Sequence, residues 1–274
     1  MRHPLVGTAL ALVLAVVPTG GGSSPLATAA SSPPGDAVTR RQGDPAAWAA
    51  WGIPPLPPPP DPPADPPLDL PVTGPVPVIS TVPTPDRVVF ITIDDGKEKD
   101  PAFVRMVTDL GVPVSMFLTR DLVQDDYAYF RPLQGLGNRI QNHTLTHPHL
   151  STLTADQQQA EICGAQTVLT EQYGSAPLLF RPPYGDAART EDLDHAVRAC
   201  GPRAVVLWHA TMQIHDLRYQ EPDRRLRPGD ILLAHFRGPA ELNGSTMTDM
   251  FAELLRRIGE QGFAVARLED YLGH

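Results

Sequence analysis

Short apolar runs alternate with longer amphipathic stretches through residues 86–274. The first run, Val88 to Ile93, is continuously apolar, which is typical of a strand covered on both faces. The pattern then predicts the following elements: helices at Pro101–Leu110, near Tyr127–Leu136, after Thr154 and at Met247–Ile258, and strands at Val114–Leu118, up to Asn142, and at Leu178–Phe180, Ala204–Leu207, Ile231–Ala234 and Ala264–Ala266. Such alternation predicts one α/β domain with a parallel sheet, open or closed into a barrel.

Proline separates this domain from the residues before it. Between Ser31 and Pro85 lie 18 of the 32 prolines, which remove backbone donors that helices and inner strands need. The run from Pro54 to Pro60 favours an extended, disordered spacer of polyproline II type over residues 30–85. We expect Trp48 and Trp51 to be disordered with it, the alternative being that they dock on the domain or on a glycan.

The first 29 residues have the pattern of an export signal. Arg2 and His3 precede an apolar stretch from Leu5 to Val17, and Ala27 to Ala29 form a small-residue cleavage site. This stretch is shorter than the roughly 20 residues of a spanning helix, so we expect no stable membrane insertion after cleavage. The pattern predicts a secreted, extracytoplasmic or wall-associated protein, with an uncleaved anchor as the alternative.

The charge and the cysteine content limit which classes of partner the chain could bind and bear on whether its cysteines form a disulfide. The formal net charge is -9 without any run of Lys or Arg, which argues against nucleic acid or an anionic membrane as a partner. No glycine-rich phosphate loop follows a strand, so no nucleotide is expected. Cys163 and Cys200 are the only cysteines, and export makes a disulfide between them our expectation, with two buried free thiols as the alternative.

Two polar clusters could together hold a metal ion. Asp94-Asp95-Gly96 ends the first strand, and a turn at Gly96 would be needed to bring both carboxylates into one pocket. His143 and His147 are four residues apart, which on a helical turn would let both nitrogens reach one ion. Two imidazoles and one carboxylate form a common ligand set that leaves positions open for water and substrate.

These clusters and two later ones resemble the polysaccharide deacetylases of the NodB-homology type. Four motifs of that family match in order over about residues 86–271: Thr92-Ile93-Asp94-Asp95-Gly96, Asn142-His143-Thr144-Leu145-Thr146-His147, Arg181-Pro182-Pro183-Tyr184-Gly185 and Leu233-Ala234-His235. The resemblance implies a distorted (β/α) barrel of about seven parallel strands, occupying residues 86–274. It also implies a secreted hydrolase that removes acetyl groups from an N- or O-acetylated polysaccharide such as peptidoglycan, a chitin-like polymer or xylan.

The resemblance assigns a role to each matching residue. It makes Asp95, His143 and His147 the metal ligands, Asp94 the general base and His235 the general acid. Arg181 would orient the base, the backbone N–H of Tyr184 would bind the oxyanion, and Leu233 would line the acetyl pocket. Trp208 is a further candidate for the substrate pocket, the alternative being a core residue. The ligand types suit zinc best, without excluding cobalt, nickel, manganese or iron.

The chain departs from the family in three places. Thr211 and Ile214 stand where acidic residues of a fourth motif are expected, so the carboxylate that tunes the acid histidine is missing. Lys97-Glu98-Lys99 follows the Asp-Asp-Gly where the family usually has proline, and His149 is an additional histidine beside the metal motif. Asp186 and Asp216 are candidate replacements for the missing carboxylate. Two alternatives to the deacetylase therefore stay open: a glycan-binding module with little turnover, and a metallohydrolase of another amide or ester.

Overall fold

The computed structural model describes residues 44–273. The expected export signal at residues 1–29 lies outside the described residues, as does the first part of the expected spacer. Among the helices of residues 44–273, none is long and apolar enough to cross a membrane.

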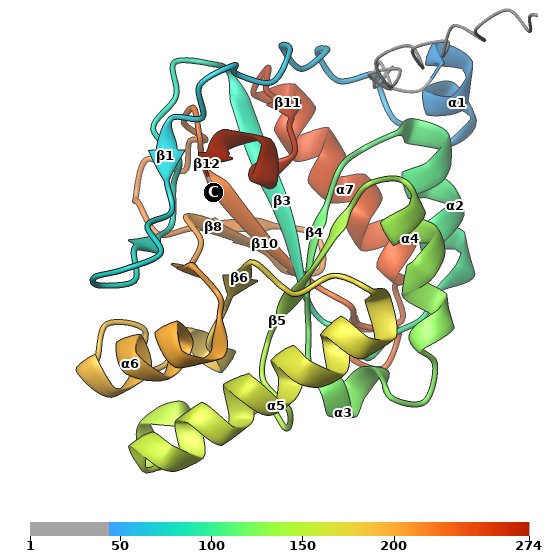
Figure 1. The fold of residues 1–274 in the computed structure, drawn as a ribbon. Coiled ribbons are helices and arrows are strands. Elements are labelled where there is room, and N and C mark those ends of the chain that lie inside the picture. Colours follow the sequence, from blue (N-terminus) through green and yellow to red (C-terminus); the bar gives the residue numbers. More distant parts are fainter. Residues whose placement is uncertain (1–43, 274) are drawn as a thin grey trace, which may run out of the picture. The chain divides into compact units, whose positions relative to one another are not determined.

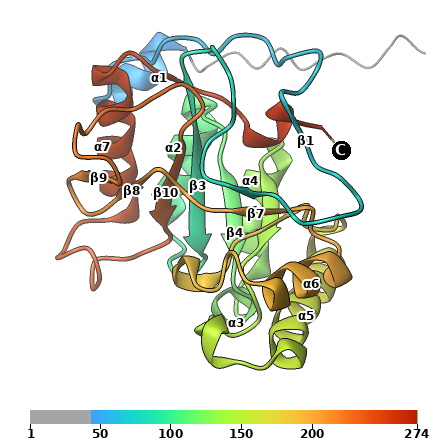
Figure 2. The same cartoon turned by 90° about the vertical axis from the view of Figure 1, so that its left-hand side faces the viewer.

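A curved, mostly parallel sheet lies at the centre of the fold (Figures 1 and 2). Its strands follow the order β2-β7-β6-β5-β4-β3-β10-β8-β9, and β11 pairs with β3. Only β9 runs antiparallel to its neighbour in this order. The strands are β2 (Val78–Ile79), β3 (Val88–Asp95), β4 (Ser115–Leu118), β5 (Arg139–Asn142), β6 (Leu179–Phe180), β7 (Ala204–Val206), β8 (Ala210–Met212), β9 (Leu217–Tyr219), β10 (Ile231–His235) and β11 (Ala264–Val265). The expectation of a distorted parallel barrel is confirmed as a half-barrel that stays open.

Helices flank this sheet and connect its strands (Figure 2). The α-helices are α1 (Pro45–Ala50), α2 (Pro101–Leu110), α3 (Arg120–Val123), α4 (Arg131–Gly135), α5 (Ala155–Tyr173), α6 (Glu191–Cys200) and α7 (Met247–Glu260). Four short 3-10 helices complete the helical set of residues 44–273: η1 (Tyr127–Phe130), η2 (Leu150–Thr152), η3 (Pro183–Gly185) and η4 (Leu268–Tyr271). Their apolar faces join the sheet in three buried clusters.

The two faces of β3 explain why the site forms on one side of the sheet. Because side chains alternate along a strand, Val89, Ile91 and Ile93 point to the side where α2 and α7 pack. Phe90 points to the concave side and belongs to a separate cluster with the C-terminal residues. The same alternation puts Asp94 on the concave side, so a carboxylate is carried into the interior of the half-barrel.

Residues 44–85 differ from the disordered spacer that the proline content predicts. Trp48 is only 1% exposed and belongs to the main core cluster, and Trp51 donates a hydrogen bond from Nε1 to Asp109 Oδ2 at 3.0 Å. Ile53 and Leu56 are buried with Trp48. A short strand, β1 (Leu68–Asp69), pairs with the C-terminal strand β12 (Leu272–Gly273). The apolar residues between the prolines thus pack on the domain, and burying them offsets the cost of ordering a chain that proline has already stiffened.

The structure pairs Cys163 with Cys200, as expected. The bond joins α5 to α6, which pack against each other beside β5 and β6. Their Cα atoms are 4.7 Å apart, within the range for a disulfide.

Replacing both cysteines with serine should lower the free energy of unfolding by about 4 kcal/mol, because the bond closes a loop of 37 residues in the unfolded chain. Urea unfolding of the variant and of the oxidised wild type would measure the difference. An unchanged midpoint would show that the bond adds no stability.

Candidate active site

Two adjacent carboxylates lie where β3 ends. Asp95 has a φ of 78° and Gly96 a φ of 89°, so the chain leaves the strand through left-handed backbone. A side chain at position 96 would collide with Val123 Cγ1, which leaves glycine as the residue that fits. The turn expected at Gly96 thus begins one residue earlier. It brings Asp94 Oδ2 and Asp95 Oδ1 to 3.6 and 3.7 Å from the same atom, His143 Nε2.

The two histidines lie on an irregular loop after β5, so the helical turn that we expected for them is wrong. Thr144 and His147 have φ values of 73° and 62°, and the loop is bent rather than helical. Asn142 Oδ1 accepts from the Thr144 N–H at 3.0 Å, and Thr144 Oγ1 accepts from the His147 N–H at 3.1 Å. These side-chain bonds replace the helical ones and leave the imidazole centroids 5.0 Å apart.

Glu161 on α5 holds the same loop from the other side. Its Oε2 accepts from the backbone N–H groups of Leu145 and Thr146 at 3.0 and 2.9 Å, and its Oε1 accepts from Thr146 Oγ1 at 2.8 Å. Leu145 also packs closely against Gly164, so a larger residue at position 164 would require the Leu145 side chain to move. The sequence analysis missed Glu161, because a glutamate on an amphipathic helix carries no signal of such a partner.

The ligand atoms of Asp95, His143 and His147 all lie within 4.8 Å of one another. Among the described residues, Asp95 Oδ1 is buried without a hydrogen-bond partner, although His147 Nε2 lies 3.3 Å away. His143 Nδ1 lies 2.7 Å from the carbonyl oxygen of Arg181, which fixes Nδ1 as the donor and leaves the Nε2 lone pair toward Asp95. Burial lowers the pKa of His143 to about 3, so its ring is neutral near pH 7, as a metal ligand must be. The set therefore fits a divalent cation.

Arg181 forms a buried ion pair with Asp94. Its Nη1 donates to Asp94 Oδ1 at 2.6 Å and to Thr92 Oγ1 at 2.8 Å, and its side chain is fully buried. Nε and Nη2 donate to the carbonyl oxygens of Val206 and Leu207. Burial raises the pKa of Asp94 above its ordinary value, and the Arg181 charge offsets part of that rise. Arg181 thus leaves Asp94 Oδ2 as the carboxylate oxygen that faces the metal ligands.

His235 ends β10, directly opposite Asp94 in the parallel register. Burial lowers the pKa of His235 to about 4, with Asp94 and Asp95 opposing the shift. Its Nδ1 is buried and has no hydrogen-bond partner among residues 44–273.

Neither aspartate proposed as a replacement partner is bonded to His235. Asp216 pairs with Arg224 at 2.9 Å, and Asp186 accepts from the Ser151 N–H at 2.8 Å. Both carboxylates are therefore engaged elsewhere. With neither aspartate beside it, Nδ1 of His235 has no carboxylate partner among the described residues.

Aromatic and apolar side chains border these polar groups. The Tyr184 ring is 59% exposed, stacks on His149 at 4.0 Å and meets the His147 ring edge-on at 4.8 Å. Trp208 packs against Gly185, with its ring centre 5.6 Å from the Arg181 guanidinium.

Leu233 is buried on β10, opposite Thr92 on β3, and therefore faces the same concave side as His235. His149 lies outside the Asp95, His143 and His147 cluster and instead extends the Tyr184 surface. The candidate residues of the four motifs thus meet at the carboxyl ends of the parallel strands.

The family model for polysaccharide deacetylase matches residues 81–205. An uncharacterised protein of Streptomyces coelicolor, SCO4760, is 42% identical over 197 residues, which cover 72% of this chain and 77% of that protein. The chain therefore belongs to the polysaccharide deacetylase family, a family of hydrolases.

Two further relatives are named for their activities. The peptidoglycan-N-acetylmuramic acid deacetylase PdaA of Bacillus subtilis is 25% identical over 69% of this chain and 73% of its own length. A bifunctional xylanase/xylan deacetylase of Cellvibrio japonicus is 26% identical over 68% of this chain, which matches only 28% of that larger protein.

Solved structures agree with the fold. The Bc1960 peptidoglycan N-acetylglucosamine deacetylase has a TM-score of 0.59 at 21% identity and covers 71% of this chain and 92% of its own. A CE4 family pseudoenzyme of Bacillus anthracis, BA3943, has a TM-score of 0.58 at 18% identity and covers 72% and 70%. One fold is thus found in a deacetylase and in a pseudoenzyme.

Glu161→Gln should weaken the binding of divalent metal by roughly 10- to 100-fold, because a neutral amide oxygen accepts weaker hydrogen bonds from the loop N–H groups than the carboxylate does and so positions the histidine loop less firmly. Calorimetric titration of the metal-free protein with Zn²⁺ would measure this loss. Glu171→Gln, on an exposed position of the same helix, is the matched control and should bind as the wild type does. Equal affinity in both variants would refute the positioning role of Glu161.

Proposed function

We propose that this protein is a metal-dependent deacetylase that removes acetyl groups from an N- or O-acetylated polysaccharide outside the cytoplasm. One observation carries the proposal: a base held by a buried arginine, a two-histidine, one-carboxylate set and a histidine acid lie around one point. Asp94 Oδ2 and Asp95 Oδ1 are both within 3.7 Å of His143 Nε2. The family membership agrees with this chemistry.

Asp95, His143 and His147 would hold the cation, with zinc as the best match to their donor types. When bound, a divalent cation polarises the acetyl carbonyl and makes water near it more acidic. The unpartnered Asp95 Oδ1 and the oriented Nε2 of His143 support this assignment.

Asp94 would take the proton from the attacking water. Arg181 holds Oδ1 of this carboxylate and Thr92 holds the arginine, so the carboxylate cannot turn away from the concave side. Its Oδ2 remains directed toward the point where the acetyl carbon would lie. Correct placement of a base of this kind contributes about 100- to 10,000-fold to a rate.

Tyr184 would stabilise the tetrahedral intermediate, and His235 would assist the departure of the leaving group. The Tyr184 N–H donates to no acceptor among the described residues and can bind the oxyanion of the tetrahedral intermediate. His235 would protonate the leaving nitrogen or oxygen. Leu233 would contact the acetyl methyl group, while the Tyr184 ring and Trp208 would contact the sugar.

A non-catalytic glycan-binding module is the second candidate. The buried and unpartnered Nδ1 of His235 favours it, because a histidine that acts as an acid usually needs a group that stabilises its charged form. In this case the site would bind metal and sugar with little turnover.

Acetate release from acetylated chitooligosaccharide, peptidoglycan and acetylxylan tests the proposal. We expect release from at least one substrate, its loss with a chelator and its return with added Zn²⁺, Co²⁺, Ni²⁺ or Mn²⁺. Asp94→Asn should lower kcat by about 100-fold or more, since the amide cannot accept the proton. Asp156→Asn, at an exposed position of α5, is the matched control and should keep full activity.

Glycan binding without acetate from any substrate would reject the deacetylase and favour the binding module. Unchanged turnover in Asp94→Asn would reject the role of the base. Full activity of protein shown to be free of metal would reject the cofactor.

Thr211→Asp should raise kcat roughly tenfold. Thr211 lies opposite Leu233 in the parallel register, so its side chain shares the concave face with His235. A carboxylate there could accept a hydrogen bond from Nδ1, and one such charged bond contributes about 1.5–3 kcal/mol.

Steady-state kinetics on the best substrate would measure the gain. Thr211→Asn has the same shape without the charge and should give no comparable gain, and Thr211→Asp should have no effect once His235 is changed to Gln. A gain that persists without His235 would show that the carboxylate acts elsewhere.

A further inference from the structure

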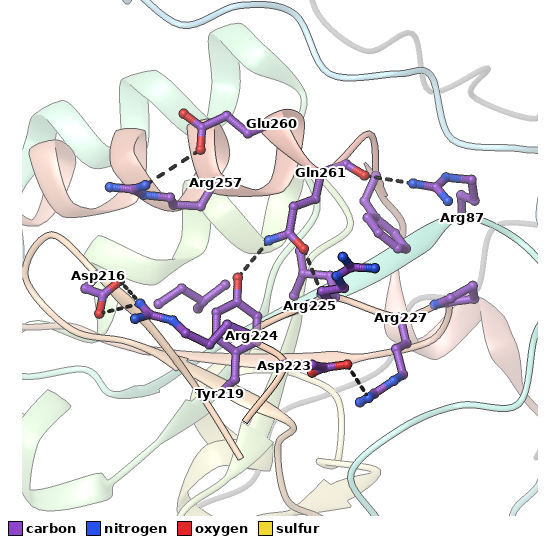
Figure 3. Close-up of a pocket in the computed structure, with 14 residues that line it drawn as sticks. Arg87, Asp216, Tyr219, Asp223, Arg224, Arg225, Arg227, Arg257, Glu260 and Gln261 are labelled. Carbon is purple, nitrogen blue, oxygen red and sulfur yellow. Dashed lines mark hydrogen bonds and ion pairs between the residues drawn. The ribbon is translucent and has the colours of Figure 1, made fainter. Parts of the chain in front are cut away.

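A cavity of about 640 Å³ lies between β9, the C-terminal end of α7 and the start of β3 (Figure 3). Arg87 immediately precedes β3 and Arg227 lies shortly before β10, whereas Asp95 and His235 are the last residues of these strands. Eight residues of β3 at about 3.3 Å each separate the two ends by roughly 25 Å. The cavity is distinct from the metal-ligand cluster, because none of the candidate ligands lines it and because Leu217 and Tyr219 pack with the core cluster on the convex side of the sheet.

Arginine dominates the charged lining of this cavity. Five arginines line it together with three carboxylates, an excess of two positive charges in a chain whose net charge is -9. The arginines come from the start of β3, from α7 and from the loop between β9 and β10: Arg87, Arg224, Arg225, Arg227 and Arg257. The local charge is thus opposite to that of the chain as a whole.

Each carboxylate of the lining is matched to one arginine (Figure 3). Asp216 accepts two hydrogen bonds from Arg224 at 2.9 and 3.1 Å. Asp223 accepts from Arg227 at 2.9 Å, and Glu260 lies 3.7 Å from the Arg257 guanidinium. Arg87 and Arg225 are therefore the two lining arginines that pair with no carboxylate of the lining.

Arg87 is held rigidly but is not neutralised. Its Nη2 and Nε donate to the carbonyl oxygens of Gln261 and Gly262 at 2.7 and 3.3 Å, and its guanidinium lies 4.6 Å from the centre of the Phe263 ring. These bonds satisfy the two carbonyls that directly follow α7, whose partial negative charge would otherwise oppose an anion here. The Nη1 group of Arg87 has no acceptor among residues 44–273.

Arg225 and Tyr219 supply two further donors. Arg225 has no hydrogen bond or ion pair in the described part of the chain, while its neighbours Arg224 and Arg227 each bind a carboxylate. The Tyr219 hydroxyl accepts from Gln261 Nε2 at 2.7 Å, which leaves its own proton for another acceptor. The Oε1 atom of Gln261 accepts from the Leu226 N–H, so the amide that orients Tyr219 is itself fixed.

We infer that this cavity binds a phosphate group, with Arg225, Arg87 and the Tyr219 hydroxyl as its donors. A guanidinium matches a pair of phosphate oxygens, and a phosphate offers more acceptor oxygens than a carboxylate does. We therefore expect phosphate to bind better than a carboxylate where two guanidinium groups and a hydroxyl donor line one cavity. The inference does not depend on the proposed deacetylase activity, because the cavity shares no residue with that site.

Titration of the intact protein with inorganic phosphate at constant ionic strength, followed by amide NMR shifts, tests the inference. We expect saturable shifts around residues 219–227 and about tenfold weaker binding in Arg225→Gln, which removes one charged donor at an exposed position. Tyr219→Phe should weaken binding less, since it removes a neutral donor. Glycerol phosphate and poly(glycerol phosphate) in place of phosphate would tell a free monoester from a polymeric diester as the source.

Two controls separate this site from general charge effects and from the metal site. Arg105→Gln removes an equal charge at an exposed position of α2 and should leave phosphate affinity unchanged. Asp95→Asn alters the metal-ligand cluster and should also leave it unchanged. Absence of saturable binding in the wild type, or equal weakening by Arg105→Gln and Arg225→Gln, would overturn the inference.

Discussion

Arg181 links four strands of the half-barrel, through its guanidinium and its backbone carbonyl, at the point where the candidate residues meet. From its position just after β6 it donates to Thr92 and Asp94 on β3 and to the carbonyls of Val206 and Leu207 at the end of β7. Its own carbonyl accepts from His143, which follows β5. A charged group that is fully buried needs all of these partners, because its removal from water costs several kcal/mol. The requirement that Arg181 be satisfied therefore also positions the base and one of the metal-ligand candidates.

The polar groups of the candidate active site lie on segments whose backbone conformation residues other than glycine rarely adopt. Asp95, Thr144, His147 and Tyr184 all have positive φ values between 62° and 78°. Each such residue costs of the order of 1–3 kcal/mol and persists only when its surroundings determine it. Glu161, through three hydrogen bonds to the loop that carries the histidines, supplies part of that determination. These hydrogen bonds to α5 thus help to stabilise the strained conformation of the histidine loop.

The fold, and the set of candidate residues that the structure brings together, could be predicted because both depend on local patterns. The apolar run of β3 and the amphipathic pattern of α2 indicated these elements at nearly their observed bounds. The conformations that bring the site together could not be predicted in the same way. The histidine loop is irregular because Thr144 and Asn142 bond to its backbone, and nothing in the spacing of the histidines distinguishes this from a helical turn. The burial of Trp48 depends likewise on a distant surface formed by α2 and α7, which proline content does not describe.

Metal binding and proton donation, the two parts of the proposed chemistry, depend on different strands. Residues that serve one of them can therefore change while those that serve the other stay the same. The metal-ligand candidates lie at the end of β3 and after β5, and the structure provides a bonded partner for His143 through Arg181. The acid candidate lies on β10, and its neighbouring strand β8 carries Thr211, where the resemblance to the family led us to expect a carboxylate. A change on β8 removes the partner of His235 but touches none of the bonds that orient Asp95, His143 or Arg181. A substitution on β8 can therefore change how His235 is partnered and leave the proposed metal ligands and their hydrogen bonds as they are.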